Sequence, residues 1–176
     1  MEHKLNTTWR LSLAQQFGAA IDMLENALLA CPAELWSDRS RQPEFWYLVF
    51  HTLFWLDLYL SESLEGFHPP APFTLQELDP AGVSPERVYS KEELHAYLEY
   101  GRKKCSVALE ALTDEKAHQR GGFDWVDGSV AELHLYNMRH VQHGAAQLNL
   151  ILRQTTNSAP RWVKTHRLPT GGDKSA

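Results

Sequence analysis

Residues 45–60 constrain the fold most strongly, because they form a helix-length run that is apolar on almost every side. The run reads Phe-Trp-Tyr-Leu-Val-Phe-His-Thr-Leu-Phe-Trp-Leu-Asp-Leu-Tyr-Leu, and Pro43-Glu44 before it suits the first turn of a helix. It contains His51 and Asp57 and is shorter than the about 20 residues that span a bilayer. A helix that is apolar all round must be covered by other elements. The sequence therefore predicts a buried central helix.

Three further stretches repeat apolar residues every three or four positions, the spacing of one helix face. They are residues 6–30, 90–112 and 129–154. The second and third of them open with an S-x-x-E capping box, at Ser90 and at Ser129. A single helical turn is expected at residues 32–36. Four long helices with one long connection predict an all-α fold, a four-helix bundle.

Residues 65–90 form the long connection between the second and third predicted helices. Their prolines and glycines preclude a long helix there. A connection of this length is either a crossover between two distant helices or a lid over a site. The length of 176 residues fits one domain. We place that domain at residues 1–155, followed by a partly disordered C-terminal tail at residues 156–176.

Net charge limits the classes of partner, and cysteine spacing indicates the compartment. The net charge is −5 and no concentrated basic surface is evident, which argues against nucleic acid as a partner. The chain opens without a charged and then apolar leader, so we expect neither secretion nor a membrane partner. Cys31 and Cys105 share no close spacing, which fits a reducing cytoplasm.

The candidate site combines histidines from two predicted helices. His140 and His143 stand three residues apart and so point into roughly one quadrant of the last helix, while His51 lies in the central helix. Imidazoles on two packed helices are the usual ligands of a divalent metal. A hydrogen-bond network or a bound small molecule would satisfy the same polar groups. The predicted metal ligands are His51, His140 and His143, and the predicted pocket residues are Asn137, Gly144 and Gln147.

The other histidines show no such grouping, and we expect them in solvent or in loops. They are His3, His68, His95, His118, His134 and His166. We expect the acidic and aromatic loop around Phe123, Asp124 and Trp125 to shape the pocket.

The chain resembles the DinB-like family over residues 11–153. The resemblance is carried by four motifs: Leu35-Trp36; Phe-His-Thr-Leu-Phe-Trp in the central helix; Val88-Tyr89-Ser90-Lys91-Glu92-Glu93-Leu94; and Arg-His-Val-Gln-His-Gly-Ala-Ala-Gln-Leu in the last helix. It implies an up-down-down-up four-helix bundle, a homodimer, and zinc, nickel or another divalent ion held by one histidine of helix two and two of helix four. The first two ligands match His51 and His140. The third falls on Gly144, with His143 one residue earlier as a possible substitute.

The resemblance also implies a function. Relatives of this type are metal-dependent enzymes, so we expect a thiol S-transferase or hydrolase-like reaction on a small-molecule thiol or another small substrate. Because Gly144 has no side chain, the alternative is a non-catalytic ligand-binding or interaction protein with a degraded metal site. In either case we expect a cytoplasmic homodimer.

Overall fold

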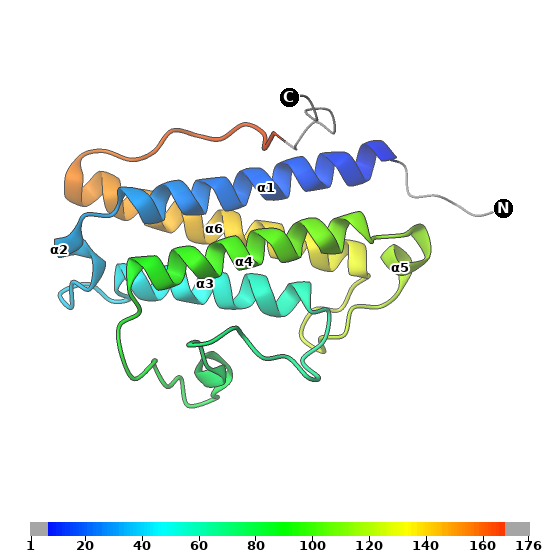
Figure 1. The fold of residues 1–176 in the computed structure, drawn as a ribbon, viewed down its shortest axis with the longest axis horizontal. Helices are drawn as coiled ribbons and strands as arrows, with labels where there is room; N and C mark the ends of the chain where they lie inside the picture. The colour runs from blue at the N-terminus through cyan, green and yellow to red at the C-terminus, as the bar shows by residue number, and fades with distance from the viewer. Residues whose placement is uncertain (1–6, 168–176) are drawn as a thin grey trace, which may run out of the picture.

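The computed structural model describes residues 7–167, and within them the chain is helical, with isolated bridges but no β-strand (Figure 1). The all-α prediction is therefore confirmed. The elements are α1 (Thr7–Ala30), α2 (Ala33–Trp36), α3 (Phe45–Leu60), the 3₁₀ helix η1 (Leu75–Leu78), α4 (Lys91–Glu110), α5 (Asp114–His118) and α6 (Val130–Thr156). No helix in this range is long and apolar enough to cross a membrane.

Both predicted capping boxes are present at the starts of α4 and α6. The Ser90 hydroxyl accepts a hydrogen bond from the Glu93 backbone N–H, and the Glu93 carboxylate accepts one from the Ser90 N–H. Ser129 and Glu132 make the same reciprocal pair. Each box satisfies two backbone donors that a helix start otherwise leaves unpaired.

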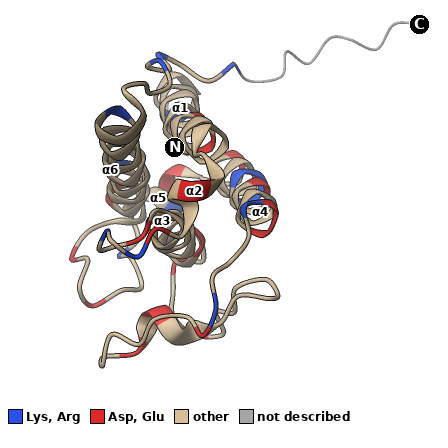
Figure 2. Ribbon diagram, turned by 90° about the vertical axis from the view of Figure 1, so that its left-hand side faces the viewer, with Lys and Arg blue, Asp and Glu red and all other residues tan. Residues whose placement is uncertain are grey.

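The four long helices pack against one another in pairs. Helix α3 packs on α4 and α6, and α1 packs on the same two helices (Figure 2). As predicted, α3 is buried nearly all round: its partly exposed residues are Tyr47, His51 and Trp55, one turn apart along a single stripe. This stripe is where α3 can present side chains to a site.

A buried ion pair joins α3 to α4. Asp57 is fully buried and accepts hydrogen bonds from Lys104 Nζ at 2.5 Å and from the Tyr97 hydroxyl at 2.9 Å. Burial raises the pKa of the Asp57 carboxyl, although the lysine and tyrosine act the other way. Two groups on α4 thus fix one polar side chain in the apolar surface of α3.

The crossover between α3 and α4 is anchored in the core. Phe67, Phe73 and Tyr89 are buried, and the Phe73 ring stacks on Tyr97 of α4 with ring centroids 4.3 Å apart. Large buried aromatic side chains hold a loop firmly. The anchored crossover carries η1 past the exposed stripe of α3.

The chain after α6 turns back and runs beside α1 (Figure 1). The His166 backbone N–H donates to the Gln15 carbonyl at 3.1 Å, and the Gln16 side chain donates to the Lys164 carbonyl at 3.1 Å. Gly18 makes room for the His166 ring, because a Cβ at Gly18 would lie 2.6 Å from its Cγ. The remainder of the predicted tail, residues 168–176, lies outside the described residues, as do residues 1–6.

Candidate functional site

Two of the predicted ligands meet between α3 and α6. The rings of His51 and His140 have centroids 5.4 Å apart and are inclined by 57°. Both histidines are partly buried, and the Tyr59 ring packs edge-on against His140. The structure therefore places side by side two imidazoles that are 89 positions apart in the chain.

A carboxylate that sequence reasoning missed holds His51. Glu77, from η1, accepts hydrogen bonds from His51 Nδ1, from the Tyr47 hydroxyl at 3.0 Å and from Trp55 Nε1 at 3.3 Å. The Glu77 side chain is 5% exposed. All three donors come from the exposed stripe of α3, so this stripe binds one carboxylate, that of Glu77.

This arrangement determines which nitrogen of His51 can act. An ionised carboxylate only accepts hydrogen bonds, so Nδ1 of His51 must carry the proton that it shares with Glu77. In the neutral ring, Nε2 then keeps its lone pair. His51 is thus prepared to act as a base or as a metal ligand through Nε2.

His140 is held in its neutral form. Its Nε2 is buried and has no hydrogen-bond partner. Burial, together with the neighbouring His51 and His143, lowers the pKa of His140 to about 4. A neutral imidazole with an unsatisfied buried nitrogen is a group that a ligand could satisfy.

The remaining predicted residues of this site differ from His51 and His140 in their exposure and contacts. His143 and Gln147 are exposed. Asn137 is buried, and its amide donates to the Leu56 carbonyl at 3.0 Å, while its own oxygen has no partner. A Cβ at Gly144 would lie 2.2 Å from Thr52 Oγ1. Asn137 and Gly144 therefore lie at the contact between α6 and α3, where Gly144 allows the helices to approach closely.

The separation of the two rings is compatible with a shared metal ion. Two imidazoles on one tetrahedral ion, with metal–nitrogen bonds of about 2.0–2.1 Å, have centroids roughly 5 Å apart, close to the separation of His51 and His140. Glu77 supplies the carboxylate that usually orients a ligating histidine. Among the described residues, however, these histidines form no group of three ligand atoms within 4.8 Å of one another. An ion here would need water or substrate to complete its shell.

Aromatic side chains surround the two histidines. Trp55 packs against His51, Tyr59 packs against His140, and Trp125 donates from Nε1 to the Tyr59 hydroxyl at 3.3 Å. The loop around Trp125 thus reaches the surroundings of the site, where the sequence placed it. On the side toward α1, a hollow of about 610 Å³ is lined by residues that include His140, His143 and Trp162.

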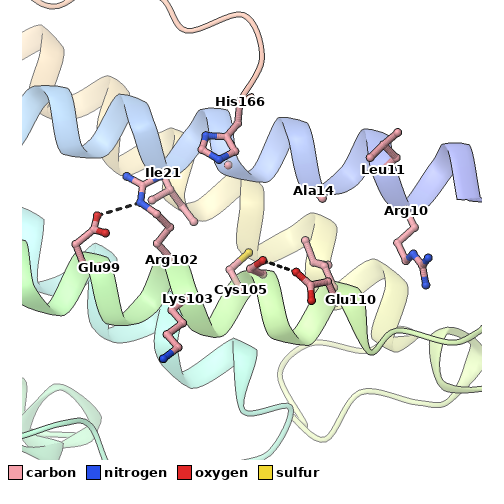
Figure 3. A pocket seen from close by; sticks show the side chains of 13 residues that line it. Arg10, Leu11, Ala14, Ile21, Glu99, Arg102, Lys103, Cys105, Glu110 and His166 are labelled. Atoms are coloured by element: carbon pink, nitrogen blue, oxygen red, sulfur yellow. Dashed lines mark hydrogen bonds and ion pairs between the residues drawn. The ribbon is translucent and has the colours of Figure 1, made fainter. Parts of the chain in front are cut away.

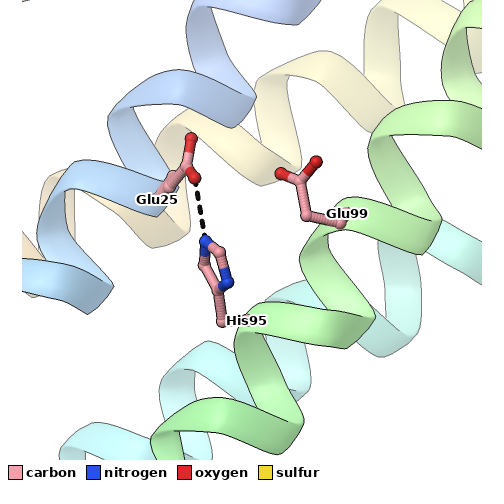
Figure 4. A group of neighbouring side chains, drawn as sticks. All are labelled: Glu25, His95 and Glu99. Carbon is pink, nitrogen blue, oxygen red and sulfur yellow. Dashed lines mark hydrogen bonds and ion pairs between the residues drawn. The ribbon is translucent and has the colours of Figure 1, made fainter.

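A different set of residues forms the three-ligand group of the described chain. Glu25 of α1 with His95 and Glu99 of α4 lie close enough to bind a metal ion, since their ligand atoms are all within 4.8 Å of one another (Figure 4). His95 Nε2 is 2.9 Å from Glu25 Oε1. The expectation that His95 belongs to no group was therefore wrong.

One more histidine, His134, differs from the expectation of a solvated or loop position, whereas His166 lies in the irregular segment after α6. His134 is fully buried in α6, and neither ring nitrogen has a hydrogen-bond partner. His166 is paired through Nδ1 with Asp22 Oδ2 at 2.7 Å. The partner of His166 comes from α1, which is distant in the sequence, so spacing along one helix could not reveal it.

The second cysteine lines a cavity between α1 and α4. This cavity has a volume of about 520 Å³ and is bordered by His166 of the returning chain (Figure 3). Burial raises the pKa of the Cys105 thiol to about 12. A thiol of this kind stays protonated at neutral pH, so Cys105 is not prepared as a nucleophile.

Glu77 is the residue of this site that sequence reasoning missed. Its loop shows no periodicity, and a single glutamate among prolines gives no sign of burial. Its signal lies on the other element: Tyr47, His51 and Trp55 recur every four residues on an otherwise apolar helix, and all three can donate a hydrogen bond.

Comparisons with protein-family models, with curated proteins and with solved structures found no match for this chain.

Proposed function

We propose that this protein is a divalent-metal-dependent enzyme of the DinB-like type, with the ion held between α3 and α6 and a thiol S-transferase or hydrolase-like reaction. The observation that carries the proposal is the pairing of His51 and His140, with ring centroids 5.4 Å apart and a buried, unsatisfied Nε2 on His140. Neutral imidazoles of this kind suit zinc or nickel.

The residues of the site have separate tasks in this proposal. Glu77 keeps the proton of His51 on Nδ1, and burial keeps His140 neutral, so both rings offer a lone pair. Trp55 and Tyr59 shield the rings from water on the aromatic side. A bound ion supplies Lewis acidity, which polarises a substrate or lowers the pKa of a bound water or thiol.

We also infer that the four long helices form an up-down-down-up bundle. Support comes from the four helix pairs that pack together and from Figure 1, in which α1 and α6 run one way and α3 and α4 the other. The homodimer, the small-molecule thiol substrate and the cytoplasmic location stay predictions from the resemblance.

One observation favours the alternative of a non-catalytic binding protein with a degraded metal site. The position that would bring a third histidine is Gly144, where even a Cβ would meet Thr52, and His143 is exposed. Two imidazoles alone hold a divalent ion less firmly than three. In this reading, His51, His140 and Glu77 form a polar network that recognises a small molecule.

Metal analysis of protein purified without a His tag separates the two proposals. We expect one zinc or nickel ion more per chain in the wild type than in His51→Ala or His140→Ala. His143→Ala is the matched control, because its side chain is exposed, and it should keep the ion. Equal metal content in the wild type and in both site variants, after zinc and nickel addition, would favour the binding protein.

Activity is tested on the same proteins. The loaded wild type is assayed for transfer of a low-molecular-weight thiol to an electrophile and for hydrolysis of thioester and amide substrates. We expect turnover that is lost in His51→Ala and His140→Ala and kept in His143→Ala. Turnover that is unchanged in the two site variants would place the chemistry elsewhere.

A further inference from the structure

We propose that Glu25, His95 and Glu99 form a divalent-cation site that fastens α1 to α4. This helix pair carries neither His51 nor His140, so the site is independent of the proposed enzyme site. His95 and Glu99 are four residues apart on α4 and therefore lie on one face, opposite Glu25 of α1 (Figure 4).

The ligand atoms are close to a coordinating arrangement. His95 Nε2 and Glu25 Oε1 are 2.9 Å apart. Neighbouring ligand atoms on one ion with bonds of about 2.0–2.2 Å lie roughly 3 Å apart, so these two need little movement. The third ligand, Glu99, has a side chain that is 49% exposed and can adjust by rotation.

The charge around the site favours a cation. Arg102 contacts three carboxylates, those of Asp22, Glu25 and Glu99, at 2.5, 2.6 and 3.0 Å. One guanidinium therefore faces three carboxylates. A divalent cation carries the charge that balances them.

Arg102 leaves ligand atoms available. It binds Oε2 of Glu25 and Oε1 of Glu99, so Oε1 of Glu25 and Oε2 of Glu99 can face an ion. Hydrogen bonds to the outer oxygen of a ligating carboxylate orient it, so Arg102 would act as the supporting partner of two ligands. The His95 side chain is 38% exposed, which leaves room for water ligands.

The donor set indicates which ions to test. One imidazole with two carboxylates suits zinc and manganese, and a solvent-facing shell completed by water accepts either. An ion that binds the folded chain alone also stabilises it, by mass action. The predicted role is structural: the ion joins the first and third long helices on the side where His166 pairs with Asp22.

The experiment uses Mn²⁺ titration followed by electron paramagnetic resonance, and thermal unfolding with and without Zn²⁺. His95→Ala and Glu99→Gln are compared with His118→Ala and Glu115→Gln, a matched pair on α5. We expect each site variant to lower Mn²⁺ affinity at least about tenfold, as the loss of a supporting partner alone can do. The site variants should also lose the rise in melting temperature that Zn²⁺ causes. The α5 variants should keep both the Mn²⁺ affinity and this rise.

All titrations are repeated in the His51→Ala/His140→Ala background, which removes the proposed enzyme site. Mn²⁺ binding that persists there and disappears with Glu99→Gln supports the α1–α4 site whatever the outcome at His51. Wild-type affinity in both His95→Ala and Glu99→Gln overturns it. Should His95→Ala unfold, Glu99→Gln decides alone, since that side chain is half exposed.

Discussion

A single carboxylate sets the chemical state of His51. Glu77 is nearly fully buried and bound by donors from three successive turns of α3. A buried carboxylate is costly unless such donors satisfy it. These donors therefore suit a side chain that only accepts hydrogen bonds. That acceptor in turn holds the ring of His51.

Glu77→Gln should allow His51 to adopt both of its neutral tautomers. The amide keeps the shape of the side chain but can also donate, so the proton is no longer confined to Nδ1. We expect ¹⁵N NMR of metal-free protein at pH 8 to show the Nδ1–H form in the wild type and a mixture in the variant. Metal affinity should fall about 10–100-fold. Glu86→Gln, in the same crossover, is the control; an identical tautomer in all three proteins would contradict this role for Glu77.

The Gly144–Thr52 contact makes a prediction about stability. An added Cβ at Gly144 would lie 2.2 Å from Thr52 Oγ1 and 2.8 Å from Cγ2. Gly144→Ala should therefore cost about 1–3 kcal/mol of unfolding free energy, despite the better helix propensity of alanine. Urea denaturation measures this, and Thr52→Ala in the same chain should recover part of the loss. Gly121→Ala, with its nearest neighbour at 3.5 Å, should change little.

At the scale of elements, the buried pair between α3 and α4 can be tested by removing one charge. Lys104→Met leaves the Asp57 carboxylate without its charged partner in the core, which costs about 3–5 kcal/mol in comparable buried pairs. We expect a correspondingly lower urea midpoint. The double variant Asp57→Asn/Lys104→Met should be less destabilised than the single one. Equal stability of the wild type and Lys104→Met would show that the pair contributes nothing.

The long helices could be predicted from the sequence because their signals are local. Ser90 and Ser129 open capping boxes within one turn, and the apolar run at residues 45–60 has a single solution, a covered helix. The helices η1 and α5 were missed. Short helices of one turn depend on contacts with other elements, such as the hydrogen bonds between Glu77 and α3, rather than on their own periodicity.

At the scale of the whole molecule, the sequence predicted that His51 and His140 meet, but it did not predict the residues around them. His51 and His140 meet because each lies on a long helix that the sequence predicts, and these two helices, α3 and α6, pack on each other. His143 is exposed because it lies three positions after His140: each position along a helix rotates a side chain by about 100°, so the two side chains diverge by about 60°. Glu77 and His95 depend on pairings between distant elements, which periodicity does not encode.

Folding stability should fall as the pH drops from 6.5 toward 4. Burial lowers the pKa of His140 from 6.5 to about 4 and also lowers that of His134, so the unfolded chain binds more protons than the folded one in this window. Each such histidine contributes up to about 1.4 kcal/mol per pH unit. Asp57 acts the other way, because its pKa is raised, and so a comparison of variants is needed.

Urea unfolding at pH 7.5, 6.5, 5.5 and 4.5 measures this dependence. His140→Gln should flatten the slope below pH 6.5, because the variant has one buried imidazole fewer. His118→Gln, at an exposed position on α5, should keep the wild-type slope. A steeper slope in His140→Gln would reverse the assignment.

The close crossing at Gly144 also has an evolutionary consequence. A histidine at that position would have to displace the threonine on the facing helix, so Gly144→His is expected to damage the fold before it can add a ligand. A lineage that gained such a ligand would need to change Thr52 first. The order of mutations at these two sites is thereby restricted, and ancestors with a small residue at both are the natural intermediates.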